Sequence, residues 1–150
     1  MFQDISLQEL LKNQDYTLID VRSPSEFKQG TIPGSINIPI FSDEERAEVG
    51  TIYKQVSQQA AKDRGLEILS AKLPEYVKKF SNISGERVVF CWRGGMRSKA
   101  AATVVDLMGI PIYRLEGGIR TYRHWVVETL ETFDMQPVTY ALNGFTGSGK

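Results

Sequence analysis

The sequence predicts an α/β fold in which a parallel sheet carries helices on both faces. Short apolar runs rich in β-branched residues alternate along the chain with longer stretches of helical periodicity, the pattern of strand–helix–strand units. The 150 residues are 41% hydrophobic and 24% charged, a balance that suits one domain with a proper core. No apolar run approaches the length of a membrane span, so we expect no membrane association.

The first part of the chain is predicted to hold a helix and two strands. Residues 6–13, SLQELLKN, have a helical pattern. Residues 17–22, TLIDVR, and residues 35–40, SINIPI, are short apolar runs and are predicted to be buried strands.

A short helical turn is expected between these two strands. Ser23 can cap it, and Pro24 suits its first position. Glu26 completes a capping box, and Gly30 ends the turn.

The next stretch, residues 41–68, is polar and mostly helix-forming. A connection of this length without structure is uncommon inside a compact domain, so we expect one or two helices inserted beside the sheet. A separate helix is predicted over residues 69–80, with Pro74 near its start.

The second half of the chain continues the alternation. Residues 87–91, RVVFC, are predicted to be a strand, and residues 98–109 a helix that ends at its glycine. Residues 112–118, IYRLEGG, read as a strand closed by a glycine pair, and residues 119–133 as a helix.

The last residues, 138–150, read as a strand that runs into Gly144, four further residues, Gly149 and Lys150. This is the phosphate-loop pattern without its final Ser or Thr. In such loops backbone N–H groups and the lysine hold phosphates, with help from the following helix. We interpret residues 1–137 as one domain and residues 138–150 as the start of a truncated P-loop domain, which as it stands cannot bind a nucleotide properly. A glycine-rich tail that matches by chance is the alternative.

The only cysteine, Cys91, ends a predicted buried strand, where open α/β sheets place their ligands. Gly94 and Gly95 allow left-handed backbone angles, so a tight loop can turn its N–H groups inward. Ser98 can cap the next helix, whose positive end points at the loop. Arg93 adds positive charge beside them. These features favour the thiolate form of Cys91. A thiolate within such an anion site is a nucleophile that can attack a sulfur, selenium or phosphorus centre.

Three other loop residues are assigned to anion binding, to packing or to the rim of the site. Arg97 is expected to bind an anion, although it could instead pair with a surface acid. Met96 is expected to pack under the neighbouring helices, whereas Trp92 could either pack or stand at the rim.

No second catalytic group competes with the cysteine. The only histidine, His124, lies in a helical pattern and is assigned a structural role. One Cys and one His far apart make no metal-ligand set, so no metal is expected. A single cysteine forms no internal disulfide, and the acidic N-terminus lacks signal-peptide character, which together predict a cytoplasmic protein.

The net charge of zero is unevenly distributed. Residues 1–86 carry 10 Lys and Arg against 13 Asp and Glu, whereas residues 87–150 carry 8 against 5. The excess of positive charge in the half that holds the cysteine indicates an anionic partner, but an ordinary solvated surface explains it equally well.

Three segments resemble rhodanese domains. Residues 18–39, LIDVRSPSEFKQGTIPGSINIP, resemble their N-terminal signature, and residues 114–125, RLEGGIRTYRHW, their C-terminal signature. Residues 88–102, VVFCWRGGMRSKAAA, resemble their active loop. The resemblance implies a rhodanese-like fold with about five parallel strands. It also implies a persulfide or perselenide on the loop cysteine, with Asp20 and Arg22 ordering the neighbouring loop.

The loop departs from ordinary single-domain rhodaneses, which usually read C-x-x-G-x-R-S. Here Cys91 and Arg97 form C-x5-R, the spacing of rhodanese-like dual-specificity phosphatases. Such phosphatases usually have His before the cysteine and an acid near the loop, whereas Phe90 precedes the cysteine here. Phosphomonoester hydrolysis therefore lacks a proton donor and is the minor alternative.

Residues 90–98, FCWRGGMRS, together with the inserted residues 45–67 and the following phosphate loop, resemble the bacterial tRNA 2-selenouridine synthase family. The resemblance implies selenium transfer from selenophosphate to the wobble 2-thiouridine of tRNA through an S-geranyl intermediate. Selenophosphate and geranyl diphosphate would be substrates, and no cofactor would be tightly bound. tRNA would bind mainly through the missing second domain. Two alternatives remain open: generic sulfur transfer and a non-catalytic binding module.

Overall fold

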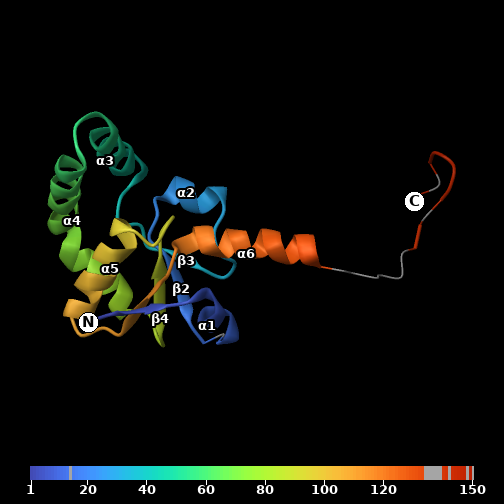
Figure 1. Ribbon diagram of the computed structural model, residues 1–150, viewed down its shortest axis with the longest axis horizontal. Helices are drawn as coiled ribbons and strands as arrows, with labels where there is room; N and C mark the ends of the chain where they lie inside the picture. Colours follow the sequence, from blue (N-terminus) through green and yellow to red (C-terminus); the bar gives the residue numbers. More distant parts are fainter. Residues whose placement is uncertain (14, 134–139, 142, 148, 150) are drawn as a thin grey trace.

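The computed structural model contains one sheet of five parallel strands in the order β1-β5-β4-β2-β3 (Figure 1). The residues it describes are 1–13, 15–133, 140–141, 143–147 and 149. The strands are β1 (Gln3–Ile5), β2 (Thr17–Asp20), β3 (Ile36–Asn37), β4 (Arg87–Phe90) and β5 (Ile112–Leu115). The helices are α1 (Leu7–Lys12), α2 (Pro24–Gln29), α3 (Asp43–Gln55), α4 (Gln58–Ser81), α5 (Met96–Leu107) and α6 (Gly118–Thr132).

The predicted α/β class and the parallel sheet are confirmed, and the strands that were predicted within residues 1–133 are all present in shorter form. β1 was missed, because three residues are too few to show a strand periodicity. These residues form a strand because they pair with β5, where Gln3 lies opposite Tyr113. The strand predicted at the start of residues 138–150 falls partly outside the described residues, and Tyr140 and Ala141, which are described, are not in a strand.

The inserted stretch forms two helices, and the second of them is longer than predicted. α4 continues from the insert through residues 69–80, so the separate helix expected there does not exist. Pro74 lies inside α4, where a proline removes one backbone hydrogen bond. Burial of Leu69 before it and Tyr76 after it anchors both halves of the helix to the core. Tertiary packing therefore outweighs the local cost of the proline.

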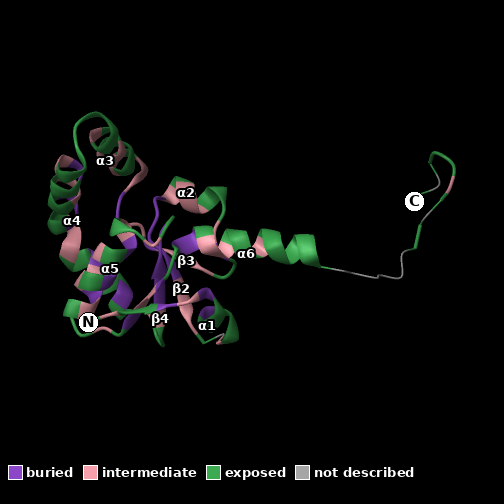
Figure 2. Cartoon of the chain, in the orientation of Figure 1, coloured by how far each residue is buried: buried purple, intermediate pink, exposed green. Residues whose placement is uncertain are grey.

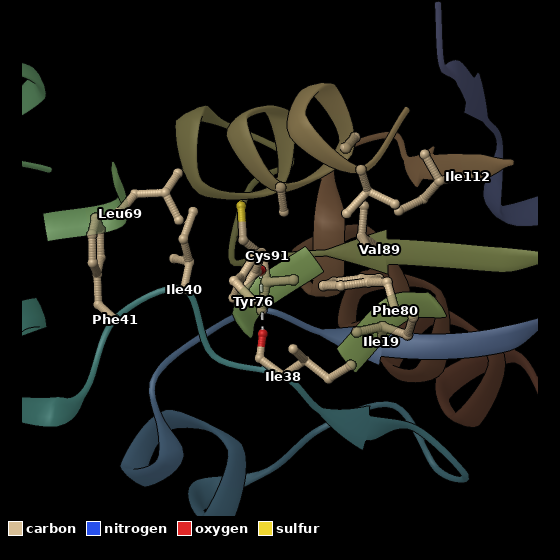
Figure 3. Close-up of a cluster of buried hydrophobic side chains, with 14 of the residues drawn as sticks. Ile19, Ile38, Ile40, Phe41, Leu69, Tyr76, Phe80, Val89, Cys91 and Ile112 are labelled. Atoms are coloured by element: carbon tan, nitrogen blue, oxygen red, sulfur yellow. Dashed lines mark hydrogen bonds between the residues drawn. The ribbon is translucent and has the colours of Figure 1, made fainter. Parts of the chain in front are cut away.

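The core has two layers, one on each face of the sheet (Figure 2). On one face, Ile19 and Val89 of the central strands pack against α4 and α5 through Phe80 and Val105, and Figure 3 shows part of this cluster. On the other face, Phe90 packs with residues of α1 and α6. No helix among the described residues combines the length and apolar character needed to cross a bilayer.

The parallel register brings the carboxyl ends of the central strands to one edge of the sheet. Asp20 of β2 lies opposite Phe90 of β4, and Val89 lies opposite Arg114 of β5. The loops that follow these strands therefore meet at one place, which is where doubly wound sheets bind their ligands.

Candidate active site

Cys91 follows directly after β4, near the middle of the sheet, and its side chain belongs to the core. The residue is only 3% exposed, and its sulfur lies 3.2 Å from the Ser98 hydroxyl of α5. Figure 3 shows the sulfur directed toward that helix, with Ile40 and Leu69 on the side of the insert. Cys91 is also one of the residues that line the pocket described below, although nearly all of its surface is covered.

The pocket beside Cys91 has a volume of about 770 Å³ and lies between the cysteine loop and the α3–α4 insert. One wall is the loop from Cys91 to Arg97, and the opposite wall is formed by the insert. The insert contributes apolar and cationic side chains to it: Val49, Tyr53, Lys54, Lys62, Leu66 and Leu69. The sequence predicted the insert but not that it forms half of this pocket, because nothing local in residues 41–68 specifies the loop opposite.

The loop backbone has the tight turn that its glycines predict, but only one glycine uses a left-handed conformation. Gly94 has φ +65°, whereas Gly95 has φ −85° and is the N-cap of α5. A side chain on Gly94 would meet backbone atoms of Leu115 and Gly117 at 3.1 Å and 3.0 Å. Within the described part of the chain, the backbone N–H groups of residues 92–98 meet no hydrogen-bond acceptor. The unpaired N–H groups of the first turn of α5 give that end of the helix the partial positive charge that attracts anions.

The prediction that Ser98 caps this helix is wrong. α5 begins at Met96, two residues earlier than predicted, so Ser98 lies within its first turn. Its hydroxyl is fully buried, donates to the Gly95 carbonyl at 3.2 Å and contacts the Cys91 sulfur. The serine is thus a direct neighbour of the thiol.

The start of α6 holds the beginning of the cysteine loop. The Ile119 N–H donates to the Cys91 carbonyl at 2.9 Å, and the Arg120 N–H donates to the Trp92 carbonyl at 3.1 Å. Gly118 fits so closely that an added Cβ would lie 2.2 Å from the Cys91 carbonyl oxygen. The glycine pair was predicted only to close a strand. Its contact with the cysteine loop was not predicted, because the two segments lie more than twenty residues apart in the sequence.

A second contact holds the middle of the loop. Arg114 of β5 donates from Nη1 to the Gly94 carbonyl at 3.0 Å. Its Nε and Nη2 bind the Asp4 carboxylate of β1 at 2.7 Å and 2.6 Å. Hydrogen bonding to Asp4 raises the pKa of Arg114, which stays charged. Sequence reasoning missed both residues, since their meeting depends on the β1–β5 pairing.

Arg97 forms the ion pair with an acid that was the alternative to anion binding. Its two terminal nitrogens bind the Glu26 carboxylate at 2.5 Å and 3.2 Å, and both side chains are about four-fifths buried. Glu26 also accepts from the Ser23 N–H at 3.2 Å, as its predicted capping role requires. Burial alone would raise the pKa of Glu26, but the hydrogen bond and charge of Arg97 outweigh burial and lower it. Glu26 therefore links α2 to the loop, while Arg97 still lines the pocket.

Replacing Glu26 by Gln should reduce stability in a pH-dependent way. A carboxyl group whose folded-state pKa is lowered stabilises the fold above its ordinary pKa and loses that effect as pH falls through the folded-state value. We expect a loss of about 1 kcal/mol near neutral pH, since the pair is partly shielded from water. Urea unfolding at about pH 7 and about pH 3 measures it, and the difference should shrink at the lower pH.

The exposed Glu128 of α6 offers a control for this measurement. Glu128→Gln should change stability little at either pH. A Glu26→Gln effect that is equally large in acid would show that the contribution of Glu26 does not come from its charge.

The remaining loop side chains lie at the pocket rim. Met96 is 58% exposed, so the expectation that it packs under the helices is wrong; α5 starts early and turns it toward the pocket. Trp92 is 36% exposed, and the Arg123 guanidinium lies 5.5 Å from its ring centroid. Arg93 is exposed and lines the pocket, and no described residue forms an ion pair with it.

Asp20 and Arg22 form a buried network beside the site. Arg22 binds the Asp20 carboxylate through Nε and Nη2, at 3.0 Å and 2.7 Å, and also donates to the Gly30 carbonyl at 2.7 Å. Thr31 donates to the same carboxylate at 2.9 Å. Asn37 donates to the Asp20 and Arg22 carbonyls, both at 2.9 Å. These bonds order the loop around α2, and through α2 they place Glu26.

Among the described residues of the predicted phosphate loop, neither Gly144 nor Gly149 lines this pocket. Gly144 and Gly149 lie in a segment without helix or strand, and Lys150 is outside the described residues. His124 is exposed on α6. No group of three or more His, Cys, Asp or Glu side chains in the described ranges could hold a metal ion.

The chain is similar to tRNA 2-selenouridine synthases from several bacteria. It is 38% identical over 147 residues to the one from Bdellovibrio bacteriovorus, a match that covers 93% of this chain and 39% of that protein. It is 37% identical over 154 residues to the one from Nitrosomonas europaea, which covers 98% and 40%. The chain thus spans about two fifths of the length of these curated relatives.

A solved structure and a family model give the fold family. The N-terminal domain of a Clostridium difficile 630 protein that is named for ATP/GTP binding superposes with a TM-score of 0.78 at 33% identity, which covers 83% of this chain and 99% of that one. The model of the rhodanese-like domain matches residues 5–124, which include strands β2 to β5, the insert and the cysteine loop. The chain therefore belongs to the rhodanese-like domain family.

Proposed function

We propose that Cys91 carries selenium in the conversion of 2-thiouridine to 2-selenouridine in tRNA, as part of a longer protein. The observation that carries the proposal is the position of Cys91 at the end of β4. It lines a pocket of about 770 Å³, and the adjoining N–H groups of residues 92–98 meet no acceptor among the described residues. The similarity to proteins named tRNA 2-selenouridine synthase supports tRNA as the substrate of this selenium transfer.

Selenophosphate is the proposed donor, because its oxyanion suits the loop. The Cys91 thiolate forms an S–Se bond as the Se–P bond breaks, and the phosphorus keeps the bonding pair. The loop N–H groups and Arg93 neutralise the oxyanion during attack, as preorganised donors do in other enzymes. The Ser98 hydroxyl lies 3.2 Å from the sulfur and has one proton, so it donates a hydrogen bond to the thiolate or to the product selenide only when it turns from the Gly95 carbonyl.

Selenium then passes to C2 of the uridine, where S-geranylation by geranyl diphosphate has made the sulfur a good leaving group. Release of selenium from the perselenide requires a thiol to reduce the S–Se bond. Cys91 is the one cysteine of these 150 residues, so a small thiol or a thiol outside them must act.

The glycine-rich segment from Gly144 to Lys150 is proposed to begin a phosphate-binding domain that follows the rhodanese-like domain. The similar Clostridium difficile domain is N-terminal in a protein named for ATP/GTP binding, which supports this order. Geranyl diphosphate and most of the tRNA would bind there, because this chain has no net charge to hold RNA.

The test is to load the chain with selenophosphate or with thiosulfate and to measure its intact mass. We expect one selenium atom on Cys91 with selenophosphate and none on the Cys91→Ser variant. The phosphorus product is diagnostic. Attack at selenium leaves the bonding pair on phosphorus and therefore releases phosphite, which ³¹P NMR distinguishes from phosphate.

Other outcomes would identify other functions. Loading by thiosulfate alone, with release of sulfite, would indicate generic sulfur transfer, which the rhodanese-like family also supports. An unmodified Cys91 with every donor would contradict the proposal. A phosphatase would instead turn over an aryl phosphate and lose that activity in Cys91→Ser.

A further inference from the structure

The C-terminal half of α6 presents apolar side chains that the described residues cover only in part or not at all. Val126, Val127, Leu130 and Phe133 form what we call the α6 apolar face. At 100° per residue they lie within one arc of about 120°. Val127, Leu130 and Phe133 are 52%, 71% and 61% exposed.

The two halves of α6 differ in their surroundings. At its start, Gly118 and Ile119 are buried against the sheet and the cysteine loop. Tyr122, one turn further on, still packs against the core. Residues 127–133 are all exposed, and Figures 1 and 2 show this end of the helix extending past the sheet. An amphipathic helix that is half buried and half uncovered is typical of a surface that another structure completes.

The described part of the chain offers no cover for this face, but the relatives indicate one. The chain spans about two fifths of their length. The similar Clostridium difficile structure is the N-terminal domain of a larger protein. Among the described residues α6 is the last helix and ends at Thr132, so a short stretch of chain joins it to a domain that begins at the glycine-rich segment around Gly144.

We propose that the α6 apolar face is the docking surface for the part of the longer protein that follows residue 150. α6 then contacts both that domain and the cysteine loop, since Ile119 and Arg120 donate to the Cys91 and Trp92 carbonyls. A shift of the docked domain would move the helix whose first turn holds the loop. The inference does not depend on selenium chemistry, and Cys91→Ser should retain the docking.

The test is hydrogen exchange of residues 126–133 in the complete protein and in the 150-residue chain. We expect exchange at least about tenfold slower in the complete protein, because docking protects the outer turns of the helix. Leu130→Asp in the complete protein should restore the fast exchange. Thr132→Asp, which adds the same charge on the opposite side of the same turn, should leave the protection in place.

Leu130 is 71% exposed, so Leu130→Asp should not alter urea unfolding of the 150-residue chain, which checks that the fold is intact. Equal exchange in the two proteins would overturn the inference. So would protection of the 150-residue chain that rises with its own concentration, which would indicate a second copy. Protection that appears only when tRNA is added would indicate RNA on this face and would also overturn it.

Discussion

Replacing Gly118 by alanine is expected to destabilise the protein by about 3 kcal/mol or more and to displace the cysteine loop. Gly118 has φ +61°, which costs a non-glycine residue about 1–2 kcal/mol. The new Cβ would also lie 2.2 Å from the Cys91 carbonyl oxygen and 2.6 Å from the Gly94 nitrogen. Both are backbone atoms, so the loop and α6 must move apart. Urea unfolding measures the loss of stability, and the alkylation rate of Cys91 reports the displacement.

Gly109 provides a matched control for this variant. It also has a left-handed φ, +73°, but an added Cβ would meet nothing within 4 Å. Gly109→Ala should therefore cost only the backbone term of about 1–2 kcal/mol and leave the alkylation rate unchanged. Equal effects of the two substitutions would show that the close approach of Gly118 to the loop does not matter.

Replacing Cys91 by serine in the complete protein is expected to reduce 2-selenouridine in tRNA to background. The hydroxyl of serine is a far weaker nucleophile than a thiolate and forms no bond to selenium under these conditions. Nucleoside mass spectrometry of tRNA from cells that make only the variant measures the effect. The fold should persist, because serine is smaller and can bond to Ser98 in place of the thiol.

A control separates this loss from damage to the loop. Met96 lines the same pocket and is 58% exposed, so Met96→Leu should keep the fold and most of the 2-selenouridine. Retained 2-selenouridine in Cys91→Ser would remove Cys91 from the reaction. Loss in both variants to the same degree would point to the pocket shape rather than to the thiol.

Features whose causes are local could be predicted from the sequence. The capping of α2 by Ser23, Pro24 and Glu26 follows from residues a few positions apart, and so do most strands and the glycine turn at Gly94. Local signals were misleading where packing opposed them. Pro74 predicted the start of a helix and instead lies inside α4, and Met96 was expected to be buried but lies on the pocket wall.

The sequence by itself determined the fold class and the position of Cys91 at the end of a central strand, ahead of a glycine loop. Only the tertiary structure decided what surrounds that loop. Glu26 pairs with Arg97, and Arg114 donates a hydrogen bond to the Gly94 carbonyl. Gly118 packs against the Cys91 carbonyl, and the insert forms the opposite wall of the pocket. The physical reason is the parallel sheet. Strand propensity, caps and turns depend on neighbours along the chain, whereas the contacts around the thiol join segments that meet only after the strands have paired.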